Sequence, residues 1–207
     1  MTGDRWGPPP SPGRGDWPGD VRARLFDRRV VFVAGRLEAG VAAQAAMEIM
    51  TLDGTGDGAI SLQLECRDGD LEAALSLMDV VELAGVPVHT TALGLVAGPP
   101  VGVVAVSARR LATPNARFGL FEARTAYAGQ ARDLERWAEH TLERNRLFCA
   151  RLAAAVGQAP ERVEADVERG TYLSAEEARD YGLIDEIVGP LGRITALPGP
   201  PMGFGPR

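Results

Sequence analysis

Val30-Val31-Phe32-Val33-Ala34-Gly35 is the stretch that sets the fold class of this chain. Five apolar residues closed by a glycine predict a short buried strand. Apolar residues at helical spacing follow over 41–52, then a turn cluster of Asp, Gly and Thr over 53–58, then an alternating strand over 59–64. The order that starts at Val30 is therefore strand, helix, strand.

The same alternation continues along the chain. Residues 71–83 have the helical period, and residues 86–93 predict another strand. Strands that alternate with helices indicate an α/β domain with a largely parallel sheet. Residues 98–107 are mostly small and β-branched, and Pro99 and Pro100 suit a first helical turn, so a helix buried on all sides is expected there.

The C-terminal half is predicted to contain three more helices and a last strand. A long charged helix is expected over 130–156 and another over 159–168. Ser174-Ala175-Glu176-Glu177 has the pattern of a capping box, Gly182 is placed to end that short helix, and a strand is expected over 183–188. The long helix carries an apolar seam made of Leu134, Trp137, Leu142, Leu147 and Leu152.

The two ends differ in composition from this central domain, which spans residues 21–190. Residues 1–20 are rich in proline and glycine, and Trp6 and Trp17 are their only large apolar side chains. This composition favours a flexible solvated tail over a docking arm with two aromatic anchors. Residues 191–207 are expected to form a second flexible tail.

The composition limits the classes of partner. With 28 acidic and 22 basic residues among 207, the net charge is −6, and no basic cluster suggests a nucleic acid or an anionic membrane. No apolar run reaches the length of a membrane span. Two cysteines, Cys66 and Cys149, are too few for a disulfide framework, so a cytoplasmic location is expected.

Six segments of the chain carry recognisable motifs in a fixed order: Arg28–Val33, Gly94, Leu111–Arg117, Gly129–Asp133, Glu168–Ala178 and Tyr181–Asp185. In this order they resemble the proteolytic subunit of the ATP-dependent Clp protease, a serine peptidase family. The resemblance covers roughly residues 22–188, and its most specific block is the C-terminal one. It implies a crotonase-like αβ superhelix with a protruding handle helix that starts near Gly129, Gln130, Ala131 and Asp133.

The resemblance also shows what this chain lacks. The position of the family's nucleophilic serine corresponds to Gly98, that of the histidine to Phe121 and that of the aspartate to Gly170. A Ser-His-Asp triad needs a nucleophile, a base and a carboxylate that orients the base, and none of these residues supplies such a group. The resemblance therefore implies a degenerate member without an intact triad.

The oxyanion hole is predicted to be lost as well. One family donor is the backbone N–H of the residue after the nucleophile, which is Pro99 here, and proline has no N–H. The second comes from a loop that corresponds to Asp68 and Gly69, where carboxylates oppose the charge that the site must stabilise. The loss of a single donor costs about two to three orders of magnitude in rate.

No other residue is a strong candidate for chemistry. Cys66 is expected in the loop beside the old site, where neighbouring acidic residues suppress its thiolate. Structural roles are favoured for Cys149, His89 and His140, and no spacing indicates a metal site or a cofactor. Phe121 is expected either to plug the vacated pocket or to be apolar filler on a half-buried strand.

Three functions remain open from the sequence. The first is a catalytically inactive structural or regulatory subunit of a Clp-type ring, which assembles with itself or with active paralogues and is served by a hexameric Clp ATPase. The second is a different enzyme on the crotonase-like fold, for which only Asp68, Asp70 and Glu122 offer polar groups. The third is a peptidase with residual or rearranged activity.

Overall fold

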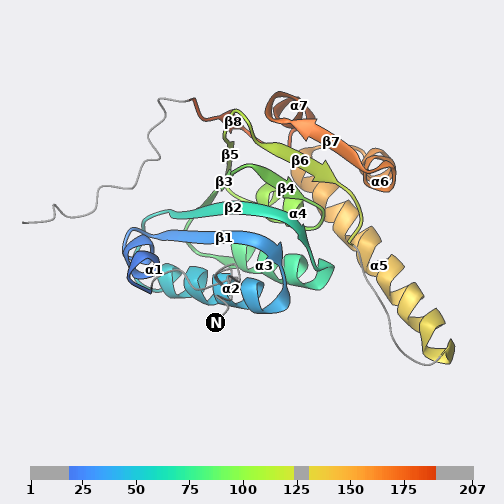
Figure 1. Ribbon diagram of the computed structural model, residues 1–207, viewed down its shortest axis with the longest axis horizontal. Helices are drawn as coiled ribbons and strands as arrows, with labels where there is room; N and C mark the ends of the chain where they lie inside the picture. Colours follow the sequence, from blue (N-terminus) through green and yellow to red (C-terminus); the bar gives the residue numbers. More distant parts are fainter. Residues whose placement is uncertain (1–18, 124–130, 190–207) are drawn as a thin grey trace, which may run out of the picture.

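The computed structural model describes residues 19–123 and 131–189, which form two neighbouring sheets with helices around them (Figure 1). The larger sheet has five parallel strands in the order β1-β2-β3-β5-β8. The smaller sheet has the order β4-β6-β7, with β4 parallel and β7 antiparallel to β6. The strands are β1 Val30–Leu37, β2 Ile60–Gly69, β3 Val88–Ala92, β4 Leu95–Ala97, β5 Arg109–Ala112, β6 Arg117–Leu120, β7 Thr171–Ser174 and β8 Glu186–Ile187.

Within the described ranges, seven helices surround or extend from the sheets, and this mixed arrangement agrees with the Clp-like α/β fold expected from the sequence. Helices α2 and α3 lie side by side against one face of the larger sheet, and α5 extends away from the body (Figure 1). None of the helices within the described ranges is long and apolar enough to cross a membrane. The helices are α1 Gly19–Phe26, α2 Ala39–Asp53, α3 Leu71–Leu83, α4 Pro100–Ala105, α5 Ala131–Val156, α6 Pro160–Arg169 and α7 Ala175–Tyr181.

Side chains of strand β2, which lies between β1 and β3, alternate between the two faces of the sheet. Leu62, Leu64 and Cys66 are fully buried in the core, whereas Gln63 and Glu65 on the other face are only half-buried. Parallel sheets are usually buried on both faces, so the half-buried polar residues mark a face with less cover. His89 of β3 belongs to this face, because it alternates with the buried Val88 and Thr90.

The predicted bounds of strand β2 and of the last strand, β8, were wrong. Strand β2 continues past Leu64 to Gly69, because pairing with β1 across a bulge between Gly35 and Arg36 keeps it extended. The last strand is only Glu186–Ile187. The residues before it are used differently: Leu183 is buried in the core, and the Asp185 carboxylate binds an arginine of β5.

The capping box before α7 is confirmed. The Ser174 hydroxyl accepts a hydrogen bond from the backbone N–H of Glu177, and the Glu177 carboxylate accepts one from the backbone N–H of Ser174. The helix ends at Gly182, which has a φ of +87°, as expected for a glycine in a left-handed C-cap.

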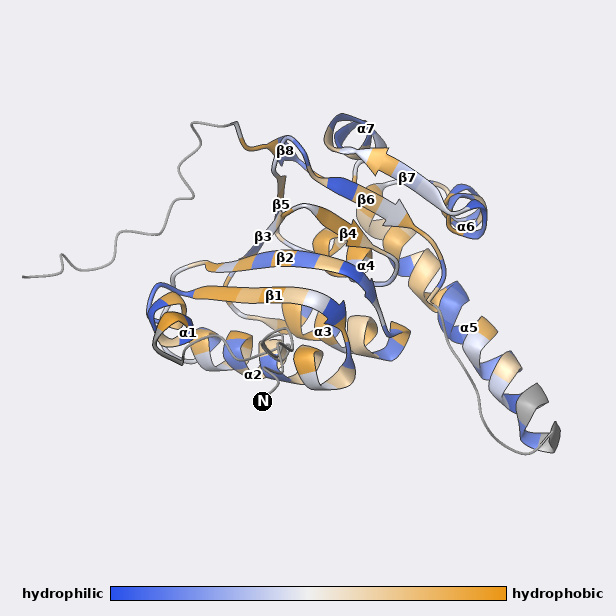
Figure 2. Ribbon diagram, viewed as in Figure 1, coloured by the Kyte–Doolittle hydropathy of each residue, from blue (hydrophilic) through white to orange (hydrophobic). Residues whose placement is uncertain are grey.

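Helix α5 was predicted correctly, but its apolar seam does not form one buried stripe. Leu152 is buried against the core, whereas Leu142 is 54 % and Leu147 43 % exposed. Figure 2 shows hydrophilic and hydrophobic residues interspersed along the protruding part of the helix. The body holds α5 through ion pairs from Arg144 to Glu72 and from Arg151 to Asp79 on α3. Part of helix α5 thus projects from the body, and Leu142 and Leu147 on this helix stay exposed.

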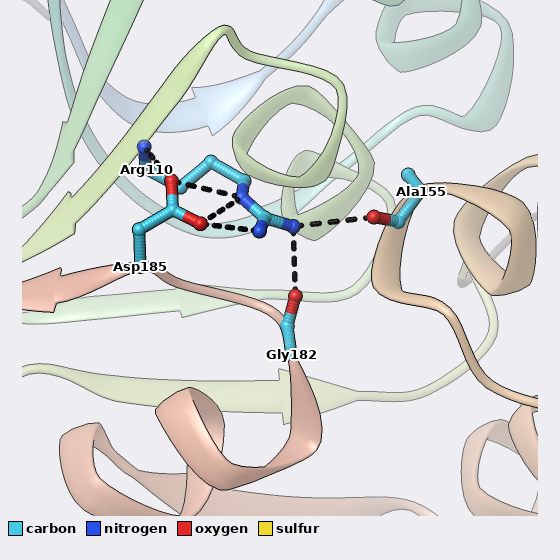
Figure 3. A network of polar contacts seen from close by, with 4 residues as sticks. All are labelled: Arg110, Ala155, Gly182 and Asp185. Atoms are coloured by element: carbon cyan, nitrogen blue, oxygen red, sulfur yellow. Dashed lines mark hydrogen bonds and ion pairs between the residues drawn. The ribbon is translucent and has the colours of Figure 1, made fainter.

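Arg110 of β5 ties three elements together (Figure 3). Its guanidinium donates to the backbone oxygen of Gly182 at 2.7 Å, to that of Ala155 at 3.2 Å, and to the Asp185 carboxylate. Arg110 therefore holds the C-terminal end of α5 and the turn after α7 against the last strands of the sheet. The hydrogen bond from Arg110 also lowers the pKa of Asp185.

We expect Arg110→Leu to lower the free energy of unfolding by about 2–3 kcal/mol, because the two partly buried carbonyls lose their donor. The control is Arg109→Leu on the same strand. Its ion pair with Glu186 is exposed, at 53 % for both side chains, so we expect a loss below about 1 kcal/mol.

The pH dependence follows from the Asp185 carboxylate, whose pKa is lowered in the folded state. Its contribution to the free energy of unfolding is therefore present at neutral pH and is lost as the pH falls below the usual aspartate range. Urea unfolding at pH 7 and pH 3 measures these effects, and equal losses for the two variants would contradict the assignment.

Candidate functional site

Gly98 forms a sharp turn between β4 and α4. Its φ is +67°, in the left-handed region that favours glycine. Its backbone N–H donates to the Gly119 oxygen of β6 at 2.8 Å, so the neighbouring strand fixes the turn. A strand, a strained turn and a helix are the parts from which hydrolases build a nucleophile elbow. The backbone at Gly98 therefore has such a form, although the residue carries no side chain.

The ring of Phe121 covers this turn. A Cβ atom built on Gly98 would lie 3.0 Å from the Cε2 atom of Phe121. A Cβ atom on Gly119 would lie 2.8 Å from the other edge of the ring, and the Phe121 and Tyr172 ring centroids are 6.0 Å apart. The ring thus lies over two glycines and beside a tyrosine. This arrangement agrees with both expectations for Phe121, a plug and apolar filler.

Gly170 lies at the end of the strand pair next to Phe121. It ends α6 with a φ of +74° and directly precedes Thr171, which pairs with Leu120 across β6 and β7. Since Leu120 precedes Phe121, the antiparallel register brings Gly170 and Phe121 to the same end of the ladder. No atom lies within 4 Å of a Cβ built on Gly170. The fold therefore brings together the three positions that the resemblance singled out.

Backbone donors at the start of α4 are missing or already used. Pro99 and Pro100 have no N–H. The N–H of Val101 donates to the Gly98 oxygen at 3.0 Å, and that of Gly102 to the Pro99 oxygen at 3.0 Å. Sequence reasoning excluded Pro99 as a donor and placed Pro100 only in the first helical turn, and it did not predict these turn hydrogen bonds. An oxyanion beside Gly98 would find none of these four groups available as a donor.

The end of β2 supplies the other expected residues, Asp68 and Gly69. A Cβ atom on Gly69 would lie 3.0 Å from the Cγ of Pro100, so this end of the strand is packed against the start of α4. The backbone N–H of Gly69 donates to the Asp68 carboxylate at 2.8 Å. The second expected oxyanion donor is therefore also occupied, by a negatively charged group.

Arg36 of β1 changes the electrostatics expected here. Its guanidinium binds the Asp68 carboxylate and donates to the Asp70 carboxylate at 2.9 Å. The hydrogen bond with Asp70 and the charges of both aspartates raise the pKa of Arg36. Arg36 thus offsets one of the two negative charges, and the expectation that the carboxylates oppose an oxyanion stays a prediction. The sequence offered one signal for these ion pairs, namely the position of Arg36 directly after Gly35, near the end of the first strand.

Both cysteines lie where thiol chemistry is disfavoured. Cys66 lies in β2, not in the loop expected, and is fully buried. Burial first, and the charge of Glu65 second, raise the pKa of its thiol to about 12. Burial likewise raises the pKa of Cys149 to about 11. Among the described residues, no group of His, Cys, Asp and Glu could hold a metal ion.

A comparison with known protein families matches residues 14–190 to the Clp protease family. The chain belongs to the Clp protease family. The match includes β1 to β8, the turn at Gly98 and helix α5. Of the residues expected to begin a handle helix, Ala131 and Asp133 lie in the first turn of α5, whereas Gly129 and Gln130 lie outside the described residues. The correspondence of Gly98, Phe121 and Gly170 to triad positions remains a prediction from the order of the motifs.

The contact between Gly98 and Phe121 predicts a specific loss of stability. Gly157 has a similar φ of +69° with no atom within 4 Å of its Cβ position, so Gly157→Ala costs only the backbone strain, about 1–2 kcal/mol. Gly98→Ala is expected to cost about 1 kcal/mol more, because the Phe121 ring must shift. In a Phe121→Ala background this excess should vanish, which a double-mutant cycle in urea measures. If Gly98→Ala and Gly157→Ala lower the free energy of unfolding equally in the parent chain, the Phe121 ring does not restrict a side chain at position 98.

Proposed function

We propose that this chain is a catalytically inactive subunit of a Clp-type ring complex, with a structural or regulatory role. The observation that carries the proposal is the composition of the turn at Gly98. A chain of this family is expected to place its nucleophile there, but this one has a glycine covered by an aromatic ring 3.0 Å from the Cβ position. The proposed role is to join rings alone or with active relatives and to alter gating, substrate choice or ATPase docking.

Chemical requirements support the inactive state. Acyl transfer needs an activated nucleophile and donors aimed at the developing oxyanion. Gly98, Phe121 and Gly170 offer neither a nucleophile nor a base, and the hydroxyl or amine of a substrate would have no group to take its proton. The backbone N–H groups of Gly69 and Val101 are already engaged. Restoring one of these groups would therefore not restore the activity, because the other groups would still be missing.

The exposed part of α5 supports a role in assembly. Leu142 and Leu147 remain 54 % and 43 % exposed on a helix that projects from the body (Figure 1). Contact with another subunit would bury these side chains and stabilise the projecting part of the helix. Members of the family generally form rings with Clp ATPases, and we propose the same kind of partner for this chain.

We expect no turnover of small fluorogenic peptides and no labelling by serine-directed phosphonates, with an active family member as positive control. Gly98→Ser alone should remain inactive, because a serine without a base is a weak nucleophile. The triple variant that adds Phe121→His and Gly170→Asp should stay far below the active member. Two further changes, Pro99→Met and Asp68→Gly, supply one backbone N–H donor and free another. Together they should raise the rate of hydrolysis more than any single triad residue does. Substantial hydrolysis by Gly98→Ser alone would disprove the inactive assignment.

We expect the chain to form an assembly much larger than a dimer, alone or when mixed with an active Clp proteolytic subunit. Leu142→Arg and Leu147→Arg together should reduce its mass, because a charge cannot be buried in an apolar contact without a large cost. Leu142→Met, which keeps an apolar side chain of similar volume, should leave the mass unchanged. Light scattering measures all three proteins. A stable monomer of the parent chain under both conditions contradicts the assembly proposal but leaves the proposed loss of activity intact.

A further inference from the structure

Helix α2 is apolar on two opposite sides, although only one of them lies against the core. The core side is buried and consists of Ala42, Ala45, Ile49 and Leu52. The opposite side, the outer seam, is exposed and consists of Gly40, Ala43, Met47 and Met50. The exposed fractions of Met47 and Met50 are 61 % and 64 %, and α2 lies at the outside of the molecule beneath β1 in Figure 1. A helix that is apolar all round is ordinarily covered on every side, so the outer seam lacks a cover within the described part of the chain.

The outer seam carries no charge that would have to leave water. Helix α2 has two charged residues, Glu48 and Asp53, and both are engaged within the chain. Glu48 forms an ion pair with Arg22 of α1 at 2.7 Å, and the Asp53 carboxylate accepts a hydrogen bond from the backbone N–H of Val86 at 2.9 Å. Burying an unpaired charge is costly, whereas covering a neutral apolar surface is favourable. Contact with another neutral apolar surface therefore suits this side of α2.

The outer seam is complementary to itself when two copies run antiparallel. Its residues are spaced by three, four and three positions, which is the spacing of the a and d positions through which two helices pack. The two residues at its N-terminal end are small, and the two at its C-terminal end are large. In an antiparallel pair centred on position 45, Gly40 lies opposite Met50 and Ala43 lies opposite Met47. Each large side chain thus meets a small residue, as close packing requires.

We propose that the outer seam of α2 binds the outer seam of a second copy of this chain, with the two helices antiparallel about a two-fold axis at position 45. A two-fold contact brings the same patch of both copies together, so a charge near the axis would face a like charge. The net charge of the chain is −6, and the neutral seam is a surface on which two copies meet without that repulsion. This contact goes beyond the proposed function, because it uses neither α5 nor the turn at Gly98.

The size of the helix sets the expected strength of this contact. A helix of 15 residues is about 22 Å long and about 10 Å wide, which gives a contact of about 220 Å² per copy. A stable interface buries about 800 Å² per partner, so α2 alone supports only a transient dimer. We therefore expect a dimer that is populated at roughly 100 μM and dissociates on dilution to roughly 1 μM.

Cysteine cross-linking in the full chain tests the proposed register. One variant carries Gly40→Cys, where a Cβ atom meets no other atom within 4 Å, and the other carries Met50→Cys. In an equimolar mixture at roughly 100 μM, diamide should join the two variants in a disulfide-linked dimer, which a non-reducing denaturing gel detects. Neither variant alone should cross-link, because its two cysteines lie about 15 Å apart along the antiparallel helices and a disulfide needs Cα atoms within about 7 Å. The native Cys66 and Cys149 are buried, and the parent chain measures their background.

A matched pair of arginine variants tests whether the seam holds the two copies together. Ala43→Arg, added to both cysteine variants, should lower the yield of the mixed dimer by roughly tenfold, because the guanidinium would be buried between the helices. Ala165→Arg makes the same change at an exposed position of α6 and should leave the yield unchanged within about twofold. Circular dichroism verifies that both arginine variants stay folded.

Each other outcome overturns the proposal. The absence of a mixed dimer at this concentration means that the two seams do not meet, whatever else covers α2. Dimers of Gly40→Cys alone mean that the helices are not antiparallel in this register. A yield that Ala43→Arg leaves unchanged means that the cysteines meet by collision. Light scattering of the Leu142→Arg and Leu147→Arg variant tests only the role of α5, so the two proposals fail separately.

Discussion

Parallel pairing of β1, β2, β3 and β5 is the constraint on which the rest of the molecule depends. Parallel neighbours need a crossover connection, so α2, α3 and α4 must run back along the sheet between the strands. The same pairing brings the carboxyl ends of the strands to one edge. At this edge Gly69, at the end of β2, packs on Pro100 at the start of α4. The location of the candidate site is therefore a consequence of the sheet, whatever residues occupy it.

The residues at that edge form a packed junction. Phe121 lies over Gly98 and Gly119 and beside Tyr172, so the turn at Gly98 and the strands of the smaller sheet meet through apolar contacts. Arg36 binds the carboxylates of Asp68 and Asp70 beside this junction and offsets one of their two negative charges. Both features satisfy groups that a catalytic site would leave ready for a substrate. The local chemistry thus favours stability of the junction over reactivity.

Local signals explain what the sequence could predict. Helix α3 was expected over 71–83 and spans Leu71–Leu83, because its apolar residues follow one period without interruption. The capping box at Ser174 and Glu177 is also local, since all its atoms belong to four consecutive residues. The match of the family to residues 14–190 follows from several such segments in a fixed order.

Contacts between distant segments explain what the sequence missed. The bond from Arg36 to Asp68 joins residues 32 positions apart, and the extension of β2 beyond Leu64 depends on the partner strand that carries Arg36. Tyr172 approaches Phe121 only because β6 and β7 pair in one register. Helix α1 was not predicted because its apolar positions are few, and packing against β1 supplies the stability that propensity does not.

Glycine at the turn links the loss of chemistry to the retention of the fold. A serine or alanine with a φ near that of Gly98 carries a strain of about 1–2 kcal/mol, which catalytic sites tolerate because the strained residue performs the chemistry. Under the proposed inactive role this strain would have no benefit, and glycine removes it while keeping the turn that connects β4 to α4. The Phe121 ring lies where a side chain at position 98 would begin. The proposal therefore treats the glycine and the aromatic ring over it as two parts of one arrangement, which leaves the sheet, the crossover helices and α5 in place for an assembly role.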